Sequence, residues 1–177
     1  VAGTRILTER RAGAAASFIA PLLLGSVNVV RGPYSSYYGS GALGGVLEAV
    51  PRRFADTSFE AGWESEGNAN YQMVGLALDG WSLGLARRAS GTTETPDGEL
   101  LPSQFEQYSA TVGRLWELDS GLEVDLLLAP SIGDDIGKPN RRYPGRVTTY
   151  PDERHLVARL GIRRAGVWHL DLYGHPN

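Results

Sequence analysis

Residues 27–46 read VNVVRGPYSSYYGSGALGGV, and this segment decides the fold of the first part of the chain. An apolar strand over residues 27–30 is followed by Arg31-Gly32-Pro33, where Pro33 has no backbone N–H to continue a strand ladder. A turn rich in serine and tyrosine then leads through closely spaced glycines, which adopt backbone conformations closed to other residues. The pattern predicts two strands joined by a tightly bent connection that passes close to other backbone or to a ligand.

Composition narrows the class of protein. The 177 residues carry a net charge of −3 with a pI near 5.6. This charge disfavours a nucleic-acid-binding protein, because such proteins usually present a basic face. There is no cysteine, which excludes a disulfide framework and a thiolate metal site. The longest apolar run, residues 17–24, is interrupted by Pro21 and is shorter than the roughly 20 residues of a membrane-spanning helix. The chain starts at Val1 rather than methionine, and we expect it to be part of a longer polypeptide.

The chain divides after residue 52. Residues 1–52 predict a small mixed α/β unit, with a helix over residues 11–20, a strand from Val27 and a second strand over residues 46–50. Residues 53–177 predict an all-β region of about seven segments in which apolar and polar residues alternate. Their apolar members are Phe59, Ala61 and Trp63; Val74, Leu76 and Leu78; Trp81, Leu83 and Leu85; Tyr108, Ala110 and Val112; Leu122, Val124, Leu126 and Leu128; Leu156, Ala158, Leu160 and Ile162; and Trp168, Leu170 and Leu172. Each segment approaches the 9–11 residues with which a tilted strand crosses a bilayer.

Connections between these segments alternate in length. Asp79-Gly80, residues 118–121 and Ala165-Gly166 predict tight turns, since Gly and Asp supply the backbone geometry of short hairpins. Longer polar connections are predicted over residues 91–104 and 133–153, with a shorter one at 66–70. Transmembrane β-barrels show this rhythm because their turns are short at one rim and their loops are longer at the other. A soluble sandwich has no reason to sort its loops in this way.

Charges and tryptophans support the same assignment. If the row of Leu156, Ala158, Leu160 and Ile162 faces lipid, Arg159 and Arg163 face inward. A charged side chain facing lipid near the middle of the bilayer would cost roughly 2–4 kcal/mol. Arg87 is the exception, because it falls on the outward row after Leu83 and Leu85. Either a bulge at Arg87-Arg88 or a position near the lipid headgroups would relieve it. The four tryptophans lie near segment ends, where barrels carry aromatic girdles; they are Trp63, Trp81, Trp116 and Trp168.

Motifs of catalysis and cofactor binding are weak. Residues 39–44 match G-x-G-x-x-G, but a strand ended by Pro51 follows instead of the helix that a dinucleotide site requires. His155, His169 and His175 could suggest a metal site, and His169 and Asp171 lie two residues apart on one strand face, but no third ligand lies at a recognisable spacing. The carboxylates at 134–135 and 152–153 are interpreted as solvated loop charge. No nucleophile elbow or H-E-x-x-H motif is present. We predict no enzyme activity, no cofactor and no metal site.

The segment from Leu22 to Arg52 resembles the end of the plug domain of TonB-dependent outer-membrane receptors, in which R-G-P is followed by S-x-x-Y-G-S-G-A and G-G-V. The resemblance implies that residues 1–52 are the C-terminal part of a plug and residues 53–177 the first strands of an antiparallel transmembrane β-barrel of about 22 strands. It also implies that the turn at residues 36–40 is a plug apex that points into the external vestibule, where Tyr38 either contacts ligand or packs the plug against the barrel wall. The ligand-binding candidates are Ser36, Tyr37, Tyr38 and Ser40, with Tyr38 the leading one, and the structural motif comprises Arg31, Gly32, Pro33, Gly39, Gly41, Gly44 and Gly45. Arg31 is expected to be buried between plug and barrel.

The resemblance implies active uptake of a scarce substrate, such as a ferric siderophore or cobalamin, across the bacterial outer membrane. The implied partners are TonB with its inner-membrane complex, a small ligand such as a metal chelate, and outer-membrane lipid. A soluble all-β ligand- or carbohydrate-binding module is the alternative, and it would need strand faces that pack a second sheet. A passive porin-like barrel is disfavoured, because it would lack the plug motif.

Overall fold

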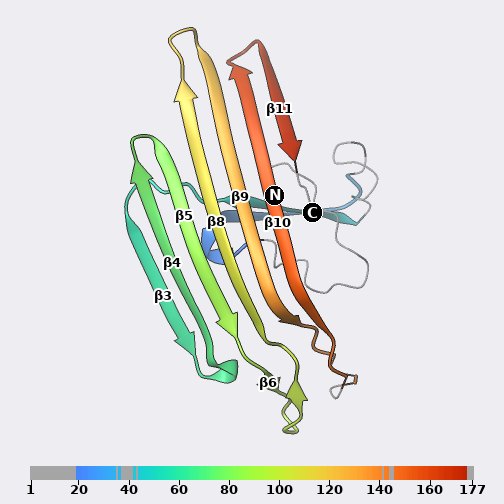
Figure 1. Cartoon of the computed structure of the whole chain (residues 1–177). Helices are drawn as coiled ribbons and strands as arrows, with labels where there is room; N and C mark the ends of the chain where they lie inside the picture. Colours follow the sequence, from blue (N-terminus) through green and yellow to red (C-terminus); the bar gives the residue numbers. More distant parts are fainter. Residues whose placement is uncertain are drawn as a thin grey trace.

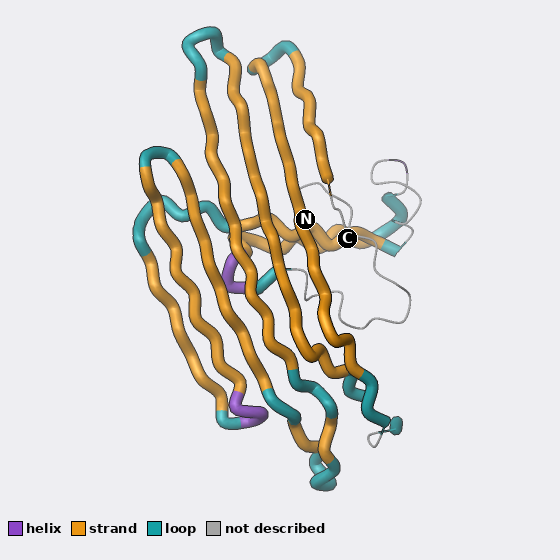
Figure 2. Tube along the Cα trace, in the orientation of Figure 1, coloured by secondary structure: helices purple, strands orange, loops and turns teal. Residues whose placement is uncertain are grey.

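A computed structural model describes residues 19–34, 36, 42, 44–140, 142–143 and 146–174, and it is built mainly of β-strands (Figures 1 and 2). A short 3₁₀ helix, η1 (Pro21–Leu23), leads into the antiparallel hairpin of β1 (Leu24–Arg31) and β2 (Gly45–Pro51). Most of the predicted helix over 11–20 lies outside the described residues, and Ile19 and Ala20 are not helical. Both predicted strands of this first region are present.

Seven further strands form one antiparallel sheet in the order β11-β10-β9-β8-β5-β4-β3. They are β3 (Ser58–Glu64), β4 (Ala69–Leu78), β5 (Trp81–Ser90), β8 (Phe105–Glu117), β9 (Leu122–Gly137), β10 (Thr149–Arg164) and β11 (Trp168–Gly174). Each strand pairs with the next sheet strand along the chain, as expected for successive hairpins. The seven predicted segments are therefore confirmed, and they form an open sheet whose edges are β3 and β11.

Short and long connections segregate to opposite ends of the sheet (Figure 1). The predicted tight turns join β4 to β5, β8 to β9, and β10 to β11 at one end, which we call the short-turn rim. The opposite, long-loop rim carries a second 3₁₀ helix, η2 (Glu66–Asn68), and the small hairpin of β6 (Thr93–Glu94) and β7 (Leu100–Leu101). The alternation of loop lengths in the sequence thus corresponds to two distinct rims.

One predicted loop is shorter than the sequence suggests. Pairing of β9 with β10 continues from Gly133↔Glu153 to Gly137↔Thr149, so the connection covers only residues 138–148. The side chains of Asp134, Asp135, Asp152 and Arg154 are exposed, so they stay in contact with water although these residues belong to the paired strands. The carboxylates predicted to be loop charge therefore lie on strands.

The two faces of the sheet differ in polarity as the sequence predicts. Cross-strand pairing places Leu76, Leu83, Val112 and Leu128 in one row on the face that we call outward. The inward face carries Ser82, Ser109, Thr111 and Ser131, all of which are buried. Such alternation is typical of barrel strands that separate lipid from a polar interior. It also disfavours the sandwich alternative, in which a second sheet would need an apolar inner face.

Arg87 lies on the outward face in a regular strand. The register of β4 with β5 and of β5 with β8 is continuous through Arg87, so the predicted bulge is not formed. A second outward arginine, Arg114, continues the row of Val112, and its guanidinium lies over the rings of Trp81 and Trp116. These two tryptophans contact each other edge to face at 5.7 Å beside the short-turn rim. The expected position of tryptophans at strand ends is confirmed for this pair.

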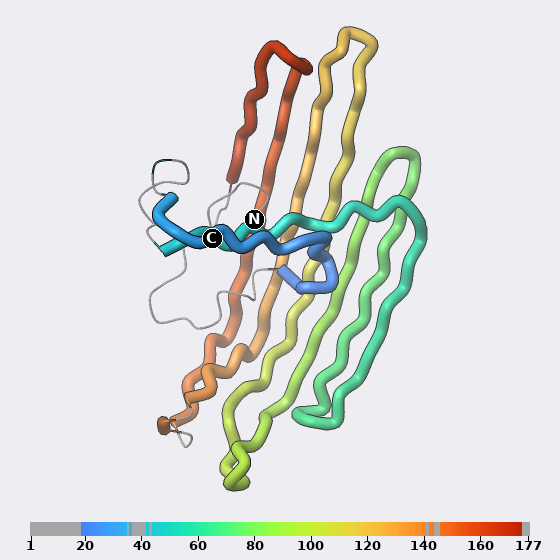
Figure 3. Tube along the Cα trace, turned by 180° about the vertical axis from the view of Figure 1, so that it is seen from behind, coloured from blue at the N-terminus to red at the C-terminus, as the bar shows by residue number. Residues whose placement is uncertain are grey.

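The β1–β2 hairpin crosses the inward face of the sheet, as the view from behind shows (Figure 3). The main buried cluster lies where its base meets the wall, and it comprises Ile19, Ala20, Leu23, Phe54, Met73, Ala86, Ala129 and Val157. No helix in the part of the chain that the structure describes is long and apolar enough to cross a membrane.

Candidate functional site

The base of the hairpin is bound to the inward face through backbone N–H groups. Ala20 N donates to the hydroxyl of Ser109 at 3.1 Å, and Phe54 N donates to the hydroxyl of Ser82 at 2.7 Å. Both serines belong to the inward rows of β8 and β5, and all four groups are buried. Since buried N–H groups without a partner are costly, these serines satisfy donors that the hairpin would otherwise leave unpaired.

Phe54 and Leu23 occupy a depression that two glycines leave in the wall. A Cβ added to Gly84 would lie 2.7 Å from the Phe54 ring and 2.8 Å from Leu23, and a Cβ at Gly75 would overlap the same ring. Gly75 and Gly84 are directly opposite each other on β4 and β5. Because Gly75 and Gly84 have no side chain, they leave a socket for the residues that flank the hairpin. These two glycines are therefore needed for close packing and not for an unusual backbone conformation.

A buried hydroxyl network continues from the Ser109 anchor across the wall. The hydroxyls of Ser109 and Ser131 are 2.9 Å apart, and the side-chain amide of Gln107 donates to Ser131 at 3.2 Å. These three side chains are at most 5 % exposed. Hydrogen-bonded polar groups of this kind fix side-chain positions in a water-poor interior. The hairpin is thus held on a preorganised polar surface.

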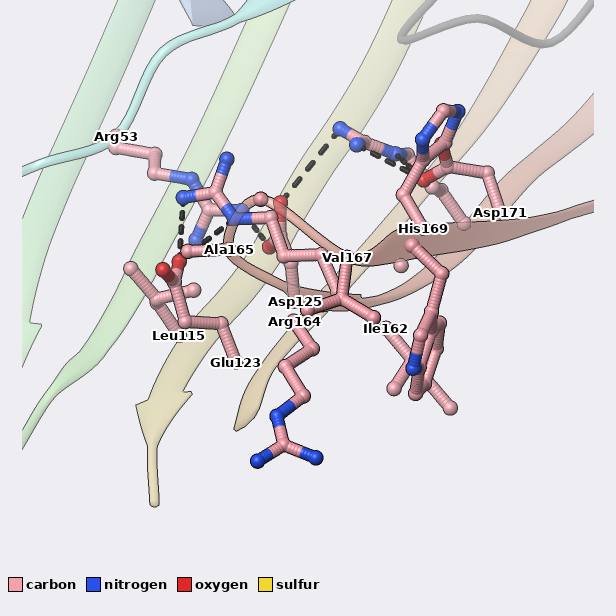
Figure 4. Close-up of a pocket in the computed structure, with 15 residues that line it drawn as sticks. Arg53, Leu115, Glu123, Asp125, Ile162, Arg164, Ala165, Val167, His169 and Asp171 are labelled. Atoms are coloured by element: carbon pink, nitrogen blue, oxygen red, sulfur yellow. Dashed lines mark hydrogen bonds and ion pairs between the residues drawn. The ribbon is translucent and has the colours of Figure 1, made fainter. Parts of the chain in front are cut away.

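A charged cavity of about 640 Å³ lies beside the anchor, near the short-turn rim (Figure 4). Arg53 extends from the segment after the hairpin and forms an ion pair with Asp125 on β9. Arg159 on β10 contacts the same carboxylate at 3.5 Å and Asp171 on β11 at 3.1 Å. The chain of charges therefore links the hairpin base to three strands of the wall.

Arginines outnumber carboxylates around this cavity. Arg163 pairs with Glu123, so that three arginines are paired with three carboxylates, and a fourth arginine, Arg164, also lines the space. The Arg53 and Asp125 side chains are 42 % and 25 % exposed, which limits the contribution of their ion pair to stability. The arrangement positions the linker and presents polar groups to water; it does not assemble a nucleophile with a base.

Two glycines of the predicted motif adopt backbone conformations that suit only glycine. Gly32 has a φ of +115° and Gly45 a φ of +137°, and they flank the bend between β1 and β2. Pro33 lies beyond the end of β1 at Arg31, as a strand stop requires. Arg31 itself is exposed, contrary to the expected burial between plug and wall, because it lies at the hairpin end farthest from the anchored base.

The predicted ligand-binding apex lies almost wholly outside the described residues. Tyr37, Tyr38 and Ser40 fall there, together with Gly39 and Gly41 of the structural motif, while Ser36 is described and exposed. Below the apex, Tyr34 N donates to the carbonyl of Ala42 at 3.0 Å. Gly44 has open space around the position of a Cβ. The role of the apex in ligand contact therefore stays a prediction.

Histidines and carboxylates do not gather into a metal site among the described residues, where no group of three or more potential ligands is found. His155 Nε2 lies 2.9 Å from a carboxylate oxygen of Glu153, and His169 lines the charged cavity. His175 lies outside the described residues.

Sequence reasoning missed the residues that hold the hairpin to the wall. Phe54, Arg53 and Asp125 belong to no motif, and the partners of Phe54 and Arg53 lie 28 and 72 residues away. One signal is present in the sequence, since Gly75 and Gly84 stand in an inward row that otherwise carries side chains. Two opposed glycines in a wall mark the place where another segment approaches closely.

Comparison with known proteins gives a consistent result. The family model of the TonB-dependent receptor plug domain matches residues 1–46. The ferrioxamine B receptor of Salmonella typhimurium is 30 % identical over 140 residues, which are 73 % of this chain and 19 % of that receptor. The hemin receptor of Yersinia enterocolitica is 38 % identical over 85 residues, which are 48 % of this chain and 12 % of that receptor.

The chain thus spans about a fifth or less of the length of the curated relatives it matches. No solved structure matches it. The matched residues include the hairpin strand β1 and the Arg31-Gly32-Pro33 motif, and the longer alignment covers most of this chain. On these findings, the chain belongs to the family of TonB-dependent receptors.

Proposed function

We propose that the full-length protein is an outer-membrane receptor that takes up a scarce metal chelate, of the siderophore or heme class, with energy supplied through TonB. The observation that carries this proposal is the hairpin of the plug-matching segment, anchored by Ser82, Ser109 and Asp125 on the inward face of the sheet. A passive pore would not need a hairpin bound across the inner face of its wall. A receptor that opens only on demand needs such a segment to close its interior.

The seven-stranded sheet is proposed to be part of the barrel wall, with its outward face in lipid. The described strands are 7–16 residues long, and the row Leu76, Leu83, Val112 and Leu128 gives this face an apolar middle. Short turns at one rim and longer loops at the other match the periplasmic and external ends of such barrels. Residues 1–52 are proposed to be plug and residues 53–177 barrel.

Ligand is proposed to contact the apex of the plug at Ser36, Tyr37, Tyr38 and Ser40. A tyrosine ring provides a face for stacking and a hydroxyl for hydrogen bonding, which suits a chelate with aromatic or carbonyl groups. The names of the relatives support a chelate, because one is a ferrioxamine B receptor and another a hemin receptor. The proposal covers both ligand classes.

The test is uptake by cells that express the full-length protein in place of their own chelate receptors. Growth under iron limitation is measured with ferrioxamine B or hemin as the sole iron source, in matched strains with and without TonB. We expect growth on at least one chelate in the strain with TonB and none in the strain without it. Growth that does not depend on TonB would refute active uptake, and growth on neither chelate would refute ferrioxamine B and hemin as its substrates.

A further inference from the structure

One arginine on the inward face, Arg88, forms no ion pair within the part of the chain that the structure describes. Arg88 belongs to β5 and lies directly across from Gln107 on β8. One inward step away, Ala86 lies across from Ser109, the serine that accepts a hydrogen bond from the hairpin base. Arg88 is therefore about 6.6 Å from the anchor row, on the side of the long-loop rim. It faces the region between the anchored hairpin and the long loops (Figure 3).

The contacts of Arg88 orient its guanidinium without neutralising it. Nη1 donates to the side-chain carbonyl of Gln107 at 3.4 Å, and the guanidinium lies over the ring of Phe105, 5.2 Å from the ring centre. The inward residues beside Arg88, on its own strand and on the two neighbouring strands, all have uncharged side chains; they are Ala86, Ser90, Tyr71, Met73, Phe105, Gln107 and Ser109. Because a guanidinium has five N–H donors, most of those on Arg88 remain available to an acceptor.

The other two inward arginines of the sheet are neutralised by the wall itself. Near the short-turn rim, Arg159 pairs with Asp125 and Arg163 with Glu123. Arg88 is partly buried like Arg159, but no carboxylate of the described residues contacts it. Removing a charge from water is unfavourable unless the charge is paired. The position of Arg88 therefore favours an anion that reaches it from the interior side of the wall.

The bend of the hairpin is not the source of this anion. Residues 32–45, which contain the predicted ligand-binding apex, include no aspartate or glutamate. A carboxylate is the anion that suits the planar fork of a guanidinium, because it accepts two parallel N–H bonds. The ring of Phe105 fixes the plane of the Arg88 fork. Since the chelate is proposed to arrive from the long-loop side, it is the molecule that can bring a carboxylate to this position.

We propose that Arg88, oriented by Phe105 and Gln107, binds a free carboxylate of the chelate. The receptor then prefers a carboxylate-bearing chelate to a neutral or cationic chelate of similar shape. The inference rests on the proposed function and deepens it, since it names the chemical class of substrate. Within the two ligand classes considered above, it favours hemin, which has carboxylate side chains, over ferrioxamine B, which ends in an ammonium group.

The experiment measures equilibrium binding of two matched pairs of chelates to the purified full-length receptor in lipid nanodiscs. The first pair is hemin and hemin dimethyl ester, in which the carboxylates are masked. The second pair is ferrioxamine B with its amine succinylated or acetylated, so that the chelate ends in a carboxylate or a neutral methyl group. In each pair that binds, we expect the carboxylate member to bind roughly tenfold more tightly, the equivalent of one charge-assisted hydrogen bond.

Variants of Arg88 show whether this residue reads the charge. Arg88→Gln is expected to abolish the preference within a pair and to leave the affinity for the neutral member unchanged. Arg88→Lys keeps the positive charge and is expected to retain part of the preference, whereas Arg88→Glu is expected to reverse it. Arg87→Gln is the matched control, because Arg87 is the adjacent residue on the opposite face of β5 and is paired with Glu106 at 2.7 Å. The control should keep the full preference.

Equal affinity for the two members of a pair in the parent receptor would overturn the inference. A preference that survives in Arg88→Gln would overturn it as well. Heat-dependent gel migration of each variant reports whether the barrel is folded. The preference of the parent receptor is measured without any substitution, so the inference stays falsifiable even where a variant fails to fold.

Failure of the inference is distinguishable from failure of the proposed function. TonB-dependent growth on a chelate, combined with equal binding of the charged and neutral members of its pair, refutes the Arg88 subsite alone. Growth that is independent of TonB refutes active uptake, whatever the charge preference. Binding of no member of either pair overturns the inference and also excludes hemin and ferrioxamine B as substrates.

Discussion

The ring of Phe54 lies over Gly84, in space that any larger residue at position 84 would fill. A Cβ there would be 2.7 Å from the ring and 2.8 Å from Leu23. The contact joins the segment after the hairpin to the wall strand β5, and it defines where the hairpin base sits.

Gly84→Ala is expected to destabilise the protein by about 1–3 kcal/mol, because the added methyl group overpacks the socket of Phe54. The measurement is the urea midpoint of the full-length protein in detergent, followed by tryptophan fluorescence. Gly174→Ala is the matched control, since Gly174 also lies in a strand but has open space around it. Equal stability of the two variants would show that Phe54 does not occupy the socket.

Asp125→Asn is expected to cost more stability than Arg53→Gln. Asp125 contacts both Arg53 and Arg159, so its neutralisation breaks two ion pairs, whereas Arg53→Gln breaks one. Both side chains are partly exposed, and the Arg53 pair alone should contribute about 1 kcal/mol or less. Urea unfolding of the single and double variants gives the coupling energy. A larger loss in Arg53→Gln than in Asp125→Asn would contradict the network.

Leu128→Arg is expected to destabilise the protein in lipid vesicles by roughly 2–4 kcal/mol, since it puts a charge on the outward face near the middle of the apolar band. Leu128 lies between Val112 and Ala158 across the strands, well away from either rim. Leu100→Arg is the control, because Leu100 is exposed in the small hairpin of a long loop. Equal effects of the two substitutions on the unfolding midpoint would argue against a lipid-facing row.

Tyr38→Ala is expected to weaken chelate binding to cells about tenfold, the loss of one aromatic contact with its hydrogen bond. Tyr38→Phe keeps the ring and is expected to lose less. Binding of labelled chelate is measured together with the amount of receptor at the surface, so that poor assembly is not mistaken for poor affinity. Unchanged binding in Tyr38→Ala would remove this residue from the ligand site.

Period-two patterning in the sequence predicts the strands, the face of each residue and the two rims, because a strand exposes alternate residues to two different environments. It also places Arg87 correctly on the outward face. Pattern alone does not reveal the continuation of β9 and β10 to Gly137 and Thr149, since polar residues there resemble a loop.

Contacts between distant segments lie beyond sequence reasoning. The pairing of Arg53 with Asp125 and the hydrogen bond of Ala20 to Ser109 depend on how the hairpin crosses the wall, which no local pattern encodes. For Arg31, the sequence motif is recognisable but the exposure of the side chain is not predictable from it. The exposure depends on the position of Arg31 at the end of the hairpin farthest from its anchored base.

The central claim is that one face of this sheet lies in lipid and the other faces the plug. Single cysteines are introduced along β8 at positions 108–113 of the full-length protein, in a background from which any other cysteine has been removed, and are spin-labelled in vesicles. The claim predicts that labels at Tyr108, Ala110 and Val112 collide with oxygen dissolved in lipid, and that labels at Ser109, Thr111 and Gly113 do not. Accessibility without this alternation, or with the opposite phase, would contradict it.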